Sequence, residues 1–173
     1  MPRERLRRLT ETGIALALVA VLNLLPPLYK LPQGGSVTYG SMVPIFYIAI
    51  RWGGWWGILT GMLGGFVNYM IDPQFYHPVQ WVLDYPVAFG ALGIAGFLRR
   101  VPLAGIVVGG VGRFLAHLTS GVVFFAAYAP KGTSPLVYSA VYNGSYMLPE
   151  IVISAIITWL LLRGLQRLEP AMR

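Results

Sequence analysis

The 173-residue chain contains no cysteine and only two histidines. Without cysteine it can form no disulfide, offer no thiolate nucleophile and hold no cysteine-ligated metal. It also lacks an HExxH zinc motif, a GxSxG nucleophile elbow and a Walker phosphate loop. From these absences we expect neither an enzyme nor a metal or cofactor site.

Charge is also scarce. Charged residues make up 11% of the chain and hydrophobic residues 56%, whereas a soluble domain carries about 25% charged residues. So few charges cannot cover a water-facing surface, and a lipid bilayer is the expected environment. The net charge of +7 could suggest a nucleic-acid partner. However, the cations lie in the gaps between apolar runs and form no basic stripe, so we expect no nucleic acid.

Six apolar segments can cross a membrane as helices, each of which needs roughly 20 mostly apolar residues. They lie at about residues 12–29, 37–52, 54–71, 79–98, 103–128 and 135–162, and the span at 37–52 is short for a crossing. No polar linker divides the chain. The sequence therefore predicts one membrane domain, residues 1–173, folded as an all-α bundle of six transmembrane helices.

The distribution of cations predicts the orientation. Six spans place ten of the 13 Lys and Arg residues on one side, namely Arg3, Arg5, Arg7, Arg8, Arg51, Arg99, Arg100, Arg163, Arg167 and Arg173. Only Lys30 and Lys131 fall in the opposite loops, and Arg113 lies within a span. Positive residues favour the cytoplasmic side. We expect a plasma-membrane protein with both termini in the cytoplasm and with its first span retained, because no small-residue cleavage site follows that span.

Glycines recur every four residues in the third span, at Gly53, Gly57, Gly61 and Gly65. Gly105 and Gly109 repeat the spacing in the fifth span. Four-residue spacing places small residues on one helix face, where another helix can approach closely. We interpret both stripes as packing surfaces within the bundle.

Ionisable residues inside membrane spans are costly and usually functional. The candidates are Asp84, Arg113, His117 and Glu150. One interpretation is structural, with an Arg113–Glu150 ion pair. The other is a pocket in which Asp84 and His117, with nearby aromatic and amide side chains, bind a small cationic heteroaromatic ligand. Such a ligand would gain up to about 2 kcal/mol from an aromatic face.

Three stretches of the chain resemble a known family. They are Gly34-Gly35-Ser36, the run from His77 to Phe89 that contains Asp84-Tyr85-Pro86, and Tyr128-Ala129-Pro130-Lys131-Gly132. They are similar to ThiT, the thiamine-specific substrate-binding (S) components of energy-coupling factor (ECF) transporters. The resemblance covers nearly the whole chain in order, and the six-span layout is also similar.

The resemblance implies an outward-opening pocket that holds thiamine between aromatic rings. It assigns binding roles to Asp84, Tyr85, His117, Gly121, Phe125, Tyr138 and Asn143, and we add Tyr76, Gln80 and Arg113 as candidates. Asp84 stands where the family often has Glu, and Phe125 where a Trp can occur. Tyr138 and Asn143 are five residues apart, about 140° around an ideal helix, so Tyr138 must precede the regular helix or reach sideways. The first outer loop lacks the Trp with which the family can close its pocket.

The resemblance further implies that the chain works with a transmembrane coupling subunit and two ATPase subunits. Members of this family dock through small residues on the first helix, and Gly13, Ala17 and Ala20 have suitable spacing here. Packing within the bundle is the alternative interpretation. For the function, the alternatives are an S component for another vitamin such as riboflavin, or a structural membrane protein with no ligand.

Overall fold

The computed structural model describes residues 3–168 of the chain. Its elements are α1 (Arg3–Leu24), β1 (Tyr29–Lys30), the 3₁₀ turn η1 (Pro32–Gly34), β2 (Ser36–Val37), α2 (Val43–Trp52), α3 (Gly54–Ile71), α4 (Pro78–Val82), the π turn η2 (Leu83–Val87), α5 (Ala88–Leu92), the 3₁₀ segment η3 (Gly93–Leu98), α6 (Pro102–Phe124), the 3₁₀ turn η4 (Ala126–Tyr128) and α7 (Pro135–Leu168). The two strands form a small antiparallel hairpin.

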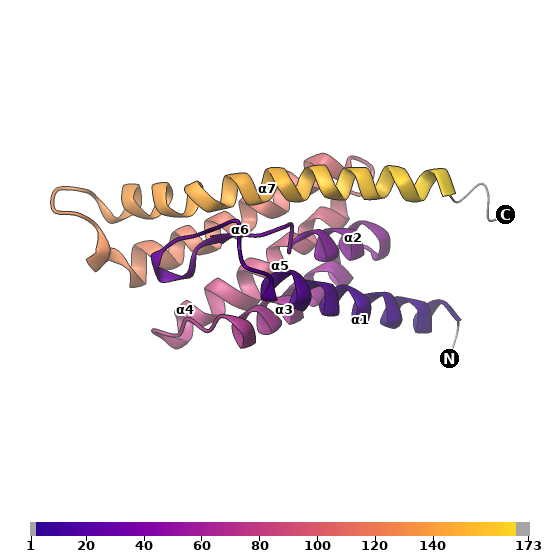
Figure 1. The fold of residues 1–173 in the computed structure, drawn as a ribbon, viewed down its shortest axis with the longest axis horizontal. Helices are drawn as coiled ribbons and strands as arrows, with labels where there is room; N and C mark the ends of the chain where they lie inside the picture. Colours follow the sequence, from indigo (N-terminus) through magenta and orange to yellow (C-terminus); the bar gives the residue numbers. More distant parts are fainter. Residues whose placement is uncertain (1–2, 169–173) are drawn as a thin grey trace.

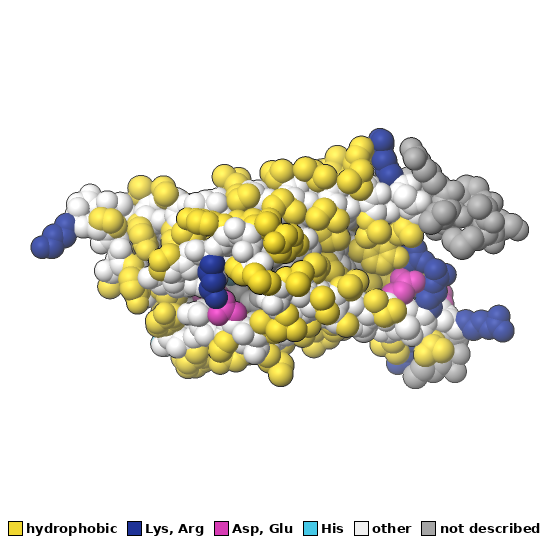
Figure 2. Space-filling model, in the orientation of Figure 1, with side chains coloured by type: hydrophobic (Ala, Val, Ile, Leu, Met, Phe, Trp, Pro, Cys, Tyr) yellow, Lys and Arg dark blue, Asp and Glu magenta, His cyan; other side chains and the backbone are white. Residues whose placement is uncertain are grey.

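The helices lie alongside one another as an elongated bundle, and α1 begins at the same end at which α7 finishes (Figure 1). Elements α4 to η3 follow one another as one helical segment, residues 78–98. This segment, α6 and residues 135–165 of α7 are long and apolar enough to cross a membrane. Hydrophobic side chains cover much of the surface between the two ends (Figure 2). The predicted class, an all-α membrane bundle, is confirmed.

The first two predicted spans need correction. Helix α1 begins at Arg3 and ends at Leu24, five residues before the predicted end. The residue before a proline disfavours the helical conformation, and Leu25, the first residue after α1, precedes Pro26. Helix α2 begins only at Val43, because Gly40 has a φ of 92° and cannot continue a right-handed helix. The start of the second predicted span, residues 37–42, is therefore not helical.

The glycine stripe of α3 packs inside the bundle, as expected. A side chain at Gly57 would collide with Ala49, and one at Gly61 with the backbone of Phe89. Gly105 and Gly109 of α6 similarly approach the backbone of η3 and α5. Gly53 differs: it has a φ of 99° and ends α2 at the turn into α3.

Charged side chains join α1 to the turn between α2 and α3. Glu11 accepts hydrogen bonds from Arg7 Nε at 2.8 Å and Trp52 Nε1 at 2.9 Å, and lies 2.8 Å from Arg51 Nε. The guanidinium of Arg8 lies 5.2 Å from the centre of the Trp52 ring. Five of the predicted same-side cations, Arg3, Arg5, Arg7, Arg8 and Arg51, therefore lie at or beside one end of the bundle, where dark blue side chains gather (Figure 2). Arg173, and the side chain of Arg167, are outside the described part of the chain.

Candidate functional site

A π turn carries the central part of the site. In residues 78–98 the regular helix is interrupted at Leu83–Val87, and Pro86 explains the interruption. Proline has no N–H to donate, and its ring crowds the carbonyl four residues earlier, so the turn widens. The wide turn rests on α3 at Gly65, where an added side chain would collide with the Tyr85 carbonyl oxygen. Asp84 and Tyr85 lie on this turn.

A cavity lies beside the π turn. Helices α3, α6 and α7, the π turn and the loop between α1 and α2 contribute to its wall. Eight of the ten predicted binding residues line it: Asp84, Tyr85, Arg113, His117, Gly121, Phe125, Tyr138 and Asn143. These residues come from three helical segments that are far apart in sequence, so the fold brings the predicted set together.

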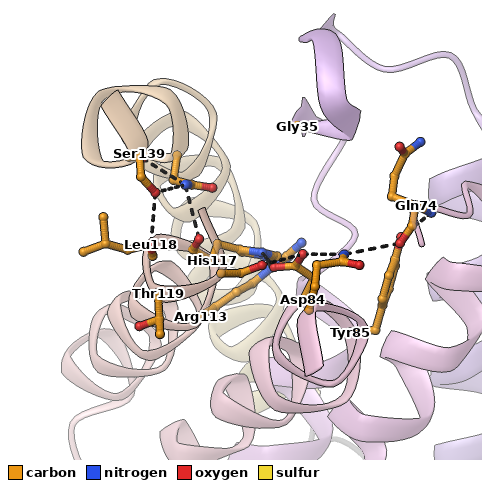
Figure 3. Close-up of polar contacts among 12 residues, drawn as sticks. Gly35, Gln74, Asp84, Tyr85, Arg113, His117, Leu118, Thr119 and Ser139 are labelled. Carbon is orange, nitrogen blue, oxygen red and sulfur yellow. Dashed lines mark hydrogen bonds and ion pairs between the residues drawn. The ribbon is translucent and has the colours of Figure 1, made fainter. Parts of the chain in front are cut away.

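Asp84 is the centre of a hydrogen-bond network (Figure 3). Its Oδ1 lies 3.0 Å from His117 Nδ1. Its Oδ2 accepts hydrogen bonds from Gln80 Nε2 at 2.7 Å and Ser120 Oγ at 2.9 Å. Donors from two helical segments therefore hold the carboxylate at the cavity wall.

The partners of His117 fix its tautomer. Arg113 Nε can only donate, and it lies 3.3 Å from His117 Nε2. Nε2 must then accept, which leaves the proton on Nδ1 for donation to Asp84. The Arg113 guanidinium lies 4.0 Å from the centre of the Phe89 ring, and its Nη1 has no hydrogen-bond partner among the described residues. Arg113 thus has a donor to spare beside the cavity.

Tyr85 connects the π turn to the loop between α3 and α4. Its hydroxyl accepts a hydrogen bond from the Gln74 backbone N–H at 2.8 Å and donates to the Asp72 carbonyl at 3.2 Å. The ring contacts Tyr69 edge-to-face with centres 5.0 Å apart. The residue is 5% exposed. Tyr85 therefore forms part of the cavity wall and also fixes the loop beside it.

The α7 wall is built from a polar cluster and a tyrosine ladder. Asn143 Nδ2 donates to the Ser139 carbonyl at 2.9 Å, and its Oδ1 accepts from the Tyr146 hydroxyl at 2.8 Å. Tyr138 lies in the first turn of α7, inside the helix, and its ring stacks on that of Tyr142. Tyr138 and Asn143 both line the cavity, so Tyr138 reaches it sideways along the ladder.

Tyr142 holds the covering loop, residues 31–38, several of which line the cavity. Its hydroxyl accepts a hydrogen bond from the Gly35 backbone N–H at 3.1 Å and donates to the Pro32 carbonyl. Gly35 has no room for a side chain, because a Cβ would lie 2.8 Å from the Tyr146 ring. Gln33 and Gly34, both with positive φ, form the tip of this loop and line the cavity. These residues lie in the segment predicted to be the first outer loop, in which the sequence has no tryptophan.

Two predicted binding residues, Tyr76 and Gln80, are not in the wall. Gln80 is buried and reaches the cavity through its bond to Asp84, while its Oε1 accepts from the Tyr76 backbone N–H at 3.0 Å. Tyr76 is 52% exposed, and its ring packs edge-to-face on Phe125, with centres 4.9 Å apart. Gln80 is therefore placed to orient Asp84, and Tyr76 to support Phe125.

The Arg113–Glu150 ion pair considered from the sequence does not form. The salt bridges of the described residues do not include it; Glu150 instead binds the backbone and hydroxyl of Thr38 at 2.6 Å each. The chain at Thr38 is not helical, so its backbone N–H has no partner within a helix and donates to Glu150. The Glu150 carboxylate is therefore bonded to Thr38 and not to Arg113.

Comparison with known proteins identifies the family of the chain. The family model described as thiamine transporter protein matches residues 9–170. The chain belongs to this thiamine transporter family. It is 40% identical to the thiamine transporter ThiT of Bacillus subtilis over 183 residues, which covers 95% of each chain. It is 32% identical to ThiT of Lacticaseibacillus paracasei over 172 residues, covering 88% of this chain and 85% of the other.

A solved structure of ThiT from Listeria monocytogenes has the same fold. Its TM-score is 0.84 at 28% identity, and the match covers 95% of this chain and 98% of that one. The resemblance noted in the sequence is therefore confirmed. Members of the thiamine transporter family are transporters and not enzymes.

Several wall residues were missed in the sequence. Tyr142 and Tyr146 follow Tyr138 at four-residue intervals, so helical spacing alone places them on one face. Asn23 and Asn68 are polar residues within apolar spans, and they bond to each other at 3.0 Å at the cavity wall. Thr38 and Gln33 carried no comparable signal, because their positions depend on how the loop folds over α7.

Proposed function

We propose that this chain is the thiamine-binding S component of an ECF-type vitamin transporter in the plasma membrane. The observation that carries the proposal is the Asp84 carboxylate, held by three donors in the wall of an aromatic-rich cavity. Membership of the thiamine transporter family supports the choice of ligand.

Thiamine has the chemistry that this cavity requires. Its thiazolium ring carries a fixed positive charge, which Asp84 would balance. Its two flat rings would pack against the aromatic wall, at Phe125 and Tyr138. The free donor on Arg113 would suit an oxygen or ring nitrogen of the ligand. Riboflavin is neutral and gains nothing from a carboxylate, and a purely structural protein needs no such cavity.

Docking to a coupling subunit would use α1. Its buried face consists of Thr12, Ala15 and Val19, so the face with Gly13 and Ala17 points out of the bundle. No atom of the described residues outside α1 lies within 4 Å of a Cβ placed on Gly13. Ala20 at the edge of this face is half-buried. Exposure of the small residues favours a docking role over packing inside this chain, because small residues let a partner helix approach closely.

Under this proposal the partner subunits hydrolyse ATP, and both termini of the chain lie in the cytoplasm. The chain has no Walker loop, so the coupling subunit and two ATPase subunits would supply the energy. The cation-rich end of the bundle, where α1 begins and α7 finishes, would face the cytoplasm.

The test combines binding and uptake. Gly13→Leu with Ala17→Leu should leave thiamine binding by the purified protein unchanged, while uptake by cells and co-purification with coupling subunits fall by about tenfold or more, because bulky side chains hold the partner helix away. Gly164→Leu in α7, another open glycine position, is the matched control and should transport normally. A double variant that transports like wild type contradicts the docking role, and a wild type that does not bind thiamine contradicts the proposed function.

A further inference from the structure

The chain between β2 and α2 is not helical although it lies inside the bundle. Residues 38–42 precede α2, and Thr38, Ser41 and Met42 are 7%, 3% and 0% exposed. Backbone N–H and C=O groups in irregular chain within a membrane must find partners in the protein, since lipid offers none. The groups that form hydrogen bonds with residues 38–42 therefore decide whether this segment keeps its position.

Glu150 of α7 bonds the Thr38 backbone directly and the Ser41 backbone through the Thr38 hydroxyl. Its Oε2 accepts the Thr38 backbone N–H and its Oε1 accepts Thr38 Oγ1, both at 2.6 Å. Ser41 Oγ lies 3.4 Å from Oε1, and the Ser41 backbone N–H donates to Thr38 Oγ1 at 2.9 Å. Glu150 is 2% exposed, so these short bonds lie away from water, where charge-assisted bonds are strongest.

Thr38 lines the cavity, and Glu150 does not. The covering loop, residues 31–38, therefore has two attachments to α7, one through Tyr142 near its tip and one through Glu150 at its far end. The Tyr142 attachment joins the loop by neutral bonds, whereas the Glu150 attachment uses a carboxylate. Losing the second should free more of the loop than losing the first.

We propose that Glu150 is a positioning residue for ligand binding. It holds Thr38 and the covering loop closed over the cavity, and so sets how fast the ligand leaves. The inference rests on the proposed thiamine-binding function, but it concerns the loop and a residue outside the cavity wall. Association requires the loop to be open, so loosening it should raise the dissociation rate more than it changes the association rate.

The experiment measures both rates with radiolabelled thiamine on the purified full chain. Glu150→Gln should raise the dissociation rate on the order of tenfold, because the amide cannot accept with both of its terminal atoms. The association rate should change less than about threefold. Thr38→Val removes one of the same bonds, should act in the same direction, and should not add fully to Glu150→Gln.

Ser154→Ala is the matched control. Ser154 lies one turn further along α7, is fully buried, and its hydroxyl has no hydrogen-bond partner among the described residues. It should leave both rates unchanged. Unchanged dissociation in Glu150→Gln, equal effects in Ser154→Ala, or full additivity with Thr38→Val would overturn the proposal.

A complementary readout needs no ligand. The chain has no native cysteine, and Val37, 5% exposed and packed in a cluster with Tyr146 and Met147, sits in the covering loop. A Val37→Cys reporter should react slowly with a water-soluble thiol reagent, and several-fold faster when Glu150→Gln is added. If Glu150→Gln speeds labelling but no variant binds thiamine, the proposed ligand is wrong and the role of Glu150 in anchoring the loop still holds. Equal labelling would refute the anchor itself, and Thr38→Val gives the same comparison if Glu150→Gln fails to fold.

Discussion

The Asp84 carboxylate and the His117 imidazole are bonded at 3.0 Å although the two residues stand on different helices. Because His117 also accepts from Arg113, its Nδ1 donates to Asp84 and orients the carboxylate beside the cavity. A fixed negative charge in a membrane interior is expensive unless a ligand or a cation uses it.

Asp84→Asn should therefore weaken thiamine binding by about 2 kcal/mol, as expected for the loss of a charge-assisted contact. A neutral ligand analogue of the same shape should lose far less. Asp72→Asn is the control, since Asp72 also borders the cavity but is already paired with Lys30 at 2.9 Å. Calorimetry on the purified proteins measures both. Equal losses for charged and neutral ligands would mean that the Asp84 charge is not recognised.

Tyr85→Phe tests the connection between the π turn and the neighbouring loop. Removing the hydroxyl deletes the bonds to Gln74 and Asp72, so we expect binding to weaken by about 1 kcal/mol with little change in stability. Tyr85→Ala also removes a buried ring and should cost about 3 kcal/mol of unfolding free energy. Thermal unfolding and thiamine titration separate the two effects. A Phe variant that binds like wild type would show that the loop does not depend on the hydroxyl.

Gly65→Ala should disturb the π turn. A Cβ there would collide with the Tyr85 carbonyl, so either α3 or the turn must move, and Asp84 moves with the turn. We expect a loss of thiamine affinity of about 1–3 kcal/mol. Gly64→Ala on the same helix is the control, because its Cβ would meet side chains and no backbone, nearest the flexible end of Ile45 at 3.0 Å. Thiamine binding measured by calorimetry should remain normal in the control. Normal binding by Gly65→Ala would show that the π turn can shift without loss of affinity.

Single engineered cysteines test the orientation of the chain in the membrane. The chain has no native cysteine, so each engineered one is labelled alone. A cysteine at Ser134 should be labelled from outside whole cells by an impermeant reagent, and one at Arg100 should not. The asymmetry follows from the positive-inside rule. Labelling of the cysteine at position 100 and not of the one at position 134 would mean that the bundle has the opposite orientation.

Periodicity and spacing predicted much of the fold. The glycine stripe of α3 matched a packing face, and the bounds of α3 were predicted as observed, because flanking glycines and a polar turn mark them. The start of α2 could not be predicted, since a non-helical segment at that depth is possible only when Glu150 and other groups in the fold satisfy its backbone. Eight residues named from the sequence line one cavity, and their role in binding stays a prediction. The roles of Tyr142 and Glu150 were not predicted, because they depend on contacts between segments more than 100 residues apart.

The most direct test of the account is a calorimetric titration of the purified wild-type chain with thiamine. None of the five tryptophans, all of which lie in the described part of the chain, lines the cavity, so heat is a safer signal than tryptophan fluorescence. The account predicts that one thiamine binds per chain with a low dissociation constant and that Asp84→Asn weakens this binding. Riboflavin should give no heat beyond its heat of dilution. Absence of thiamine binding, or equal binding of riboflavin, would contradict it.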